Sequence, residues 1–199
     1  MVRNKYLIVI VLISIVIGVV FFYTRTPFSY VLKEVGADSA RNATYVIDGL
    51  SVTLKNGVSE MPIYDSSAKV ITRYFGKEVY HDLDGDGLED IVFLLTQTTG
   101  GSGTFFYVVA ALNTSEGYVG SYAFLLGDRI APQTTVIDEG KTSNGTKRQN
   151  VIIVNYADRN PGEPMTSTPS LGRSIWLKLD LKTMQWGEVA QNFEGESSR

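Results

Sequence analysis

"DIVFLLTQ" (90–97) and "GTFFYVVAALN" (103–113), separated by the turn residues "TTGGS" (98–102), decide the fold. Each is a continuous apolar run that is bounded by turn residues and contains β-branched and aromatic side chains. Short runs of this kind are typical of buried strands, and a connection with Gly residues can close a hairpin between them. The two stretches therefore predict two core strands joined by a hairpin tip.

Further β-rich runs lie on both sides of this hairpin. "ATYVI" and "LSVTL" surround Asp48-Gly49, a strong signal for a two-residue hairpin turn. The run at 173–189 alternates apolar residues with polar or larger ones, so we expect one strand with one buried side. The apolar residues are Ile175, Leu177, Leu179 and Leu181. The other expected strands are "KVITRYFGKEVYHDL" (69–83), "GYVGSYAFLLG" (117–127), "TTVID" (134–138), "QNVIIVNYAD" (149–158) and "RSIWLKLDLKTMQWGEV" (173–189).

About eight to ten strands with short turns, and no strong amphipathic helix beyond the N-terminal segment, favour a mainly β domain. We expect an antiparallel sheet that forms a sandwich or a barrel-like structure, together with one N-terminal transmembrane helix. The expected parts are a cytoplasmic start and transmembrane anchor (1–26), a stalk or short helix (27–42), an extracytoplasmic β domain (43–190) and a frayed tail (191–199).

The anchor prediction rests on residues 6–23, which carry no charge. As a helix they would span about 27 Å, close to the hydrocarbon core of about 30 Å. Arg3 and Lys5 precede the run and favour a cytoplasmic N-terminus, so the rest of the chain would lie outside a cytoplasmic membrane that it crosses once. No small residues stand at signal-peptidase spacing, which favours an uncleaved signal anchor. A cleaved signal peptide is the alternative.

Composition excludes several classes of partner and site. The net charge of −3 disfavours nucleic acid, which requires a basic face. The absence of cysteine excludes disulfides, thiolate metal sites, a cysteine nucleophile and a lipid-modified N-terminal cysteine.

The acidic stretch "HDLDGDGLED" (81–90) has the spacing of a calcium loop. With Asp82 as the first position, carboxylates or a backbone carbonyl fall on alternate positions, and Gly85 and Gly87 permit the tight backbone that wraps around an ion. Such closely spaced like charges are unfavourable unless a cation compensates them. We expect a structural Ca²⁺, with an unliganded Asp/Gly turn as the alternative, and Mg²⁺ fits less well because it retains several waters. The expected ligands are Asp82, Asp84, Asp86, Leu88 (through its carbonyl) and Asp90.

The helix-loop-helix form of this site needs a Glu at the twelfth position, where this chain has Phe93, and no helix pattern flanks the loop. "DLDGDGLEDIVF" instead resembles the calcium loops of FG-GAP and VCBS-type β repeats. That resemblance implies a loop whose last Asp opens a strand. Those families carry the loop in tandem copies, whereas this chain has one, so no propeller is implied.

A wider resemblance extends over residues ~43–180. The order of "VITRYFGKEV", "DLDGDG", "GGSGTFFYVVAAL", "LLGDRIAPQT" and "VNYADR" is similar to a group of uncharacterised bacterial envelope proteins that are membrane-tethered or lipid-anchored. The resemblance implies an envelope location and a related fold, without an activity. This chain departs from the lipid-anchored members because it has no cysteine.

Two Asp-Arg pairs, each ending a strand shortly before a proline, form a candidate surface site. Antiparallel strand order could bring them to one end of the sheet, and a long Pro-, Ser- and Thr-rich loop follows the second pair. Local turn and ion-pair chemistry is the alternative. The residues are Asp128, Arg129, Asp158, Arg159 and Glu163.

Catalytic residues are not expected. His81 is the only histidine and adjoins the acidic loop, and Ser102 lacks the strand-elbow-helix setting of a nucleophile. We therefore expect a membrane-anchored binding or structural module with an envelope protein or glycan as partner. The alternative is an anchored hydrolase that acts on cell-wall or glycan substrates at the Asp-Arg face.

Overall fold

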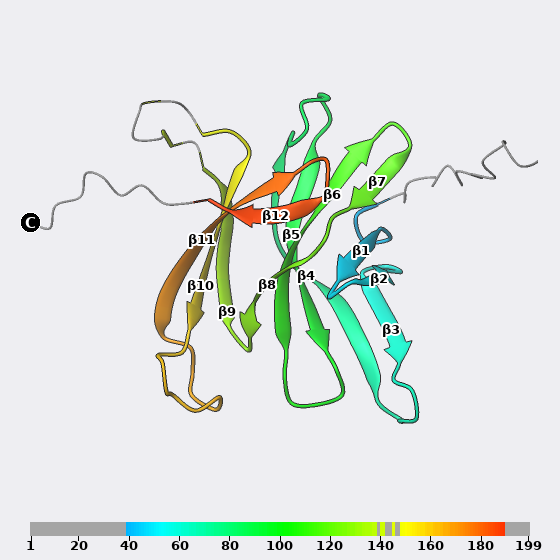
Figure 1. The fold of residues 1–199 in the computed structure, drawn as a ribbon, viewed down its shortest axis with the longest axis vertical. Coiled ribbons are helices and arrows are strands. Elements are labelled where there is room, and N and C mark those ends of the chain that lie inside the picture. Colours follow the sequence, from blue (N-terminus) through cyan, green and yellow to red (C-terminus); the bar gives the residue numbers. More distant parts are fainter. Residues whose placement is uncertain (1–38, 139, 142–144, 146–147, 190–199) are drawn as a thin grey trace, which may run out of the picture. The chain divides into compact units, whose positions relative to one another are not determined.

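The computed structural model describes residues 39–138, 140–141, 145 and 148–189, and in this part of the chain there are twelve β-strands and no helix (Figure 1). The strands are β1 (Thr44–Ile47), β2 (Leu50–Thr53), β3 (Val58–Pro62), β4 (Lys69–His81), β5 (Asp90–Thr98), β6 (Phe105–Thr114), β7 (Gly117–Gly120), β8 (Phe124–Asp128), β9 (Ala131–Ile137), β10 (Val151–Asp158), β11 (Leu171–Asp180) and β12 (Gln185–Glu188). The predicted mainly β, antiparallel fold is confirmed.

No helix in the described ranges is long and apolar enough to cross a membrane. The predicted anchor at 6–23 and the predicted tail at 191–199 lie outside the described residues. The same holds for most of the predicted stalk, although Ala40 is buried in the core of the β domain.

The predicted hairpin of two core strands is confirmed. β5 and β6 pair antiparallel, from Ile91 opposite Ala111 to Gln97 opposite Phe105. β5 also pairs with β4 along its other edge, so its backbone hydrogen-bonding groups have partners on both sides. β5 is therefore an interior strand.

These strands belong to a six-stranded sheet in the order β3-β4-β5-β6-β7, with β8 paired to the remaining length of β6. The run at 117–127, expected as one strand, is two, because the chain leaves the sheet between β7 and β8. Ser121 marks the break: its hydroxyl accepts the N–H of Ala110 at 2.9 Å and donates to the carbonyl of Tyr122 at 2.8 Å. Tyr122 then forms an isolated parallel bridge with Val46 of β1.

The predicted hairpin around Asp48-Gly49 is confirmed as β1 and β2. Asp48 has φ of 51° and Gly49 has φ of 80°, and positive φ at both central residues is what a type I′ turn requires. This two-stranded sheet buries Tyr45, Ile47 and Val52 against the larger sheet.

β5 carries core residues on both faces, which explains its continuous apolar run. Ile91, Phe93 and Leu95 pack in the cluster formed with the β1-β2 hairpin. The ring of Phe93 meets that of Tyr45 edge to face, with 5.6 Å between the ring centroids, and stacks on that of Tyr74, with 4.4 Å between centroids. On the other face of β5, the intervening residues pack against the second sheet. This second cluster includes Val92, Leu94, Val108, Ala110, Ile152, Val154, Leu177 and Leu179.

The second sheet has four strands in the order β12-β11-β10-β9. β9 also lies against β4 of the larger sheet, so the two sheets meet along one side as a half-barrel. The expectation of one strand through residues 173–189 is wrong beyond Asp180. Leu181 is 43% exposed in a turn, and Met184, with φ of 56°, directs the chain back as β12.

Candidate functional site

The acidic loop connects β4 to β5 and brings three of the predicted ligands together. Asp82, Asp84 and Asp86 each offer a carboxylate oxygen, and these oxygens lie within 4.8 Å of one another. Asp82 is half-buried, while Asp84 and Asp86 are exposed. Hard oxygens at this spacing suit a divalent cation such as Ca²⁺.

The loop is folded by hydrogen bonds from its own backbone. Asp82 accepts the N–H groups of Gly85 at 2.7 Å and Gly87 at 3.1 Å. Asp84 accepts the N–H of Asp86 at 3.1 Å, and Asp86 accepts that of Leu88 at 2.8 Å. Both glycines have positive φ, 83° and 88°, as the sequence predicted. An ionised carboxylate has about four acceptor positions, so these bonds leave lone pairs for a cation.

Asp90 has a different environment from the three carboxylates of the triad. Its side chain is fully buried, and its two oxygens accept the N–H groups of Leu83 at 2.8 Å and Asn113 at 2.7 Å. Burial raises the pKa of the Asp90 carboxyl, although both N–H groups act against this. In the described part of the chain, Asp90 is not in the carboxylate group that could hold a metal. It holds the loop to the ends of two core strands, and the ligand roles of Asp90 and the Leu88 carbonyl stay predictions.

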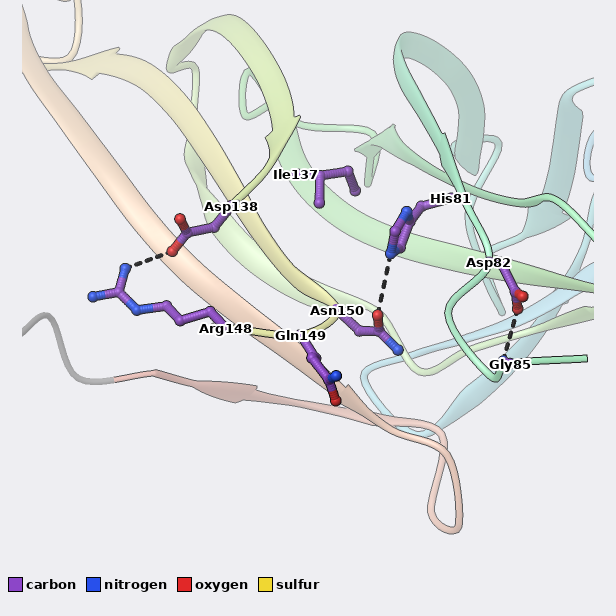
Figure 2. Close-up of a pocket in the computed structure, with 8 residues that line it drawn as sticks. All are labelled: His81, Asp82, Gly85, Ile137, Asp138, Arg148, Gln149 and Asn150. Atoms are coloured by element: carbon purple, nitrogen blue, oxygen red, sulfur yellow. Dashed lines mark hydrogen bonds and ion pairs between the residues drawn. The ribbon is translucent and has the colours of Figure 1, made fainter. Parts of the chain in front are cut away.

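A pocket of about 340 Å³ adjoins the acidic loop (Figure 2). It is lined by His81, Asp82, Gly85, Ile137, Asp138, Arg148, Gln149 and Asn150. Asn150 fixes one wall, because its Nδ2 donates to the carbonyl of Leu83 at 2.5 Å and its Oδ1 lies 3.1 Å from His81 Nε2. The start of β10 is thereby tied to the end of β4 and to Leu83 inside the loop.

Asp138 and Arg148 form an ion pair at the opposite end of this pocket, with Oδ2 and Nη1 2.5 Å apart. Their side chains are 8% and 16% exposed, so water screens the pair weakly. Burial by itself would raise the pKa of Asp138, but hydrogen bonds from Arg148 and the Gly140 N–H hold it below its ordinary value. Asp138 is therefore a carboxylate at neutral pH.

The two Asp-Arg pairs of the second predicted site lie close together, and their role as a binding site stays a prediction. Arg159 Nη1 donates to the carbonyl of Arg129 at 2.9 Å, which joins the two Asp-Arg pairs. Arg129 also bonds Asp128, and Arg173 lies 3.7 Å from Asp158. Burial alone would raise the pKa of Asp128, but the hydrogen bonds from Arg129 and the Thr104 N–H hold it below its ordinary value.

Glu163 accepts two hydrogen bonds from Asn160, through its backbone N–H and its side-chain amide. These bonds lie within the connection between β10 and β11, which spans residues 159–170. The contacts of Glu163 described here are thus local to that loop.

Sequence reasoning missed the wall of the pocket opposite the acidic loop. Asn150 lies 69 residues from His81 along the chain, and Asp138, Arg148 and Gln149 belong to no motif. Only a register between the two sheets could have placed these residues beside the acidic loop. The sequence offered no support for His81 or Ser102 as a catalytic residue. In the structure His81 faces Asn150, and Ser102 is exposed at the tip between β5 and β6.

No family model matches this chain, and no similar protein was found among curated proteins or solved structures.

Proposed function

We propose that this chain is a membrane-anchored, extracytoplasmic β domain that is stabilised by one Ca²⁺ ion and acts as a binding or structural module of the cell envelope. The observation that carries the proposal is the convergence of Asp82, Asp84 and Asp86 in the loop between β4 and β5. Three like charges at this spacing repel one another, and a bound divalent cation removes that repulsion.

The position of the loop gives the cation a structural role. Leu83, inside the loop, is buried in the core between the two sheets, and Asp90 attaches the end of the loop to β6. A cation that binds only the folded loop therefore stabilises the whole domain by mass action. Ca²⁺ suits the site better than Mg²⁺, since it accepts six to eight oxygens in irregular geometry.

Calcium binding is tested on the full-length protein in detergent, by melting temperature and calorimetric titration. We expect Ca²⁺ to raise the melting temperature, a chelator to reverse the rise, and Mg²⁺ to have a smaller effect. Asp84→Asn should abolish the response. Asp65→Asn is the matched control, because Asp65 is an exposed loop aspartate outside the triad. A melting temperature indifferent to Ca²⁺ and chelator would rule out the metal.

The anchor and location rest on the uncharged run at 6–23 preceded by Arg3 and Lys5. They are tested by protease protection in intact cells and in spheroplasts. The β domain should be cut only when protease reaches the outer side of the cytoplasmic membrane. Cleavage that requires lysis of that membrane would reverse the proposed topology.

The hydrolase alternative has less support from the Asp-Arg face. A general acid must hold a proton near the working pH, whereas Arg129 and the Thr104 N–H help keep the pKa of Asp128 below its ordinary value. Asp158 lies beside Arg173. Both carboxylates therefore serve as hydrogen-bond and ion-pair acceptors at the ends of β8 and β10.

A further inference from the structure

The pocket beside the acidic loop has the construction of a small-molecule site. Its residues come from two separate parts of the chain, the end of β4 with the acidic loop and the segment from the end of β9 to the start of β10. Figure 2 shows the Asp138 and Arg148 pair at one end, Asp82 and Gly85 at the other, and His81, Gln149 and Asn150 between them. A volume of about 340 Å³ falls at the lower end of the range of about 300–1,000 Å³ for ligand pockets. This volume suits a small ligand or a single unit of a larger one.

Hydrogen-bond donors with spare capacity face this space. Arg148 bonds Asp138 through Nη1 and has further N–H groups on its guanidinium. Gln149 is exposed, and no described residue bonds its side-chain amide. Asp82 supplies acceptors at the far end, and Ile137 supplies an apolar contact. The wall thus offers both donors and acceptors around one apolar side chain.

Charge decides which class of ligand fits. Asp138 lines the pocket, and the triad that includes Asp82 stands at its edge. Against these four carboxylates stand Arg148, already paired, and a divalent cation if one is bound. The surroundings stay negative in either case, so a carboxylate or phosphate ligand would be repelled. A hydroxyl carries no charge and both donates and accepts, which matches the mixed wall.

We propose that this pocket binds a neutral polyhydroxyl ligand, namely one sugar unit of a glycan. The proposal deepens the function proposed above and rests on it in one respect. The triad brings one oxygen from each of three carboxylates together, fewer than the six to eight that Ca²⁺ takes, and sugar hydroxyls can fill open positions beside Asp82. Calcium and sugar should then each raise the affinity of the other by the same factor.

The test is a titration of the full-length protein with methyl glucoside and with methyl N-acetylglucosaminide, in which binding is detected by NMR or calorimetry. The detergent must have no sugar headgroup, because that group would compete. We expect weak binding of a glycoside in Ca²⁺ and weaker binding in chelator, with no binding of acetate or inorganic phosphate. Gln149→Ala should lower the affinity about two- to tenfold, the loss expected for one hydrogen bond. Gln185→Ala, an exposed glutamine on β12 outside the pocket, should not change it.

The outcomes separate the two proposals. If Ca²⁺ stabilises the protein but neither glycoside binds, the sugar site is overturned and the calcium proposal stands. If a glycoside binds equally well in chelator, or if Gln149→Ala binds like the parent, the assignment to this pocket and its calcium is overturned. Stronger binding of acetate or phosphate than of the glycosides would overturn the choice of a neutral ligand.

Discussion

The carboxylate of Asp90 joins the start of β5 to the end of β6, because its Oδ1 accepts the backbone N–H of Asn113 at 2.7 Å. Its other oxygen accepts the N–H of Leu83 at 2.8 Å, inside the acidic loop. One fully buried side chain therefore fixes the loop and two core strands in register. Asp90 thus stabilises the fold from a buried position, whereas Asp84 and Asp86 in the same loop are exposed.

Asp90→Asn should lower the free energy of unfolding by about 1–3 kcal/mol, because an amide offers one acceptor where two N–H donors need one each. The loss should be the same in chelator and in calcium, as measured by urea unfolding. Asp84→Asn should not lower the stability in chelator, since Asp84 is exposed and without a cation its charge is repelled by those of Asp82 and Asp86. Equal losses for both variants in chelator would contradict this division of roles.

Arg148→Gln should destabilise the domain by about 1.5–3 kcal/mol at neutral pH, because it removes the charged partner of a buried carboxylate. The folded pKa of Asp138 is lowered from an ordinary value of 3.8. Its ionisation therefore stabilises the fold above that value, and this stabilisation is lost as pH falls through the folded pKa. The gap between parent and variant should narrow in acid.

This pH dependence is measured by urea unfolding at neutral pH and near pH 3. Lys69→Gln is the control, because it breaks a pair with Glu60 whose side chains are 54% and 44% exposed and should change stability little. A gap between parent and Arg148→Gln that is the same at both pH values would show that Asp138 does not depend on Arg148.

Gly120→Ala should cost about 1–3 kcal/mol through overpacking. A β-carbon at Gly120 would lie 2.2 Å from the carbonyl oxygen of Thr44, so β7 and β1 would have to separate. Gly172→Ala is the matched strand control, because a β-carbon there meets nothing within 4 Å and alanine reduces the freedom of the unfolded chain. Thermal denaturation of both variants provides the comparison, and equal melting temperatures would argue against the close approach.

Asn150→Asp should destabilise the domain in chelator by about 1–3 kcal/mol, because a carboxylate oxygen would replace the amide donor that faces the Leu83 carbonyl. Asn56→Asp is the control. Asn56 has φ of 52° against 57° for Asn150, so the two substitutions share a backbone conformation, but the Asn56 side chain is exposed. If both variants unfold at the same urea concentration, the link between Asn150 and the loop contributes nothing.

Local signals predicted the elements that depend on local chemistry. The Asp48-Gly49 turn, the apolar runs of β5 and β6, and the glycine positions of the acidic loop each follow from backbone preference or from burial. Of the two strand boundaries that the sequence missed, the one between β7 and β8 depends on a distant partner, whereas the one between β11 and β12 is a local turn in which the Met184 N–H bonds the Asp180 carbonyl at 2.7 Å. Ser121 breaks a strand because Ala110 and Tyr122 bond its hydroxyl.

The candidate site likewise has a part that the sequence predicted and a part that it did not. The spacing of aspartates in "DLDGDG" predicted the triad, because its geometry lies within one turn. The roles of Asp90 and Asn150 could not be predicted, since they are defined by Asn113, Leu83 and His81 across strand pairings. The pocket exists only because the two sheets close against each other beside the loop.

The β1-β2 hairpin that covers one face of β5 has a consequence for the order of events during synthesis. It leaves the ribosome before the strands it covers, so Tyr45 and Ile47 must remain without their partners on β5 and β6 until those strands have been made. Contacts between segments so far apart in the chain form slowly. A nascent chain halted between β2 and β6 would therefore be a natural substrate for a chaperone.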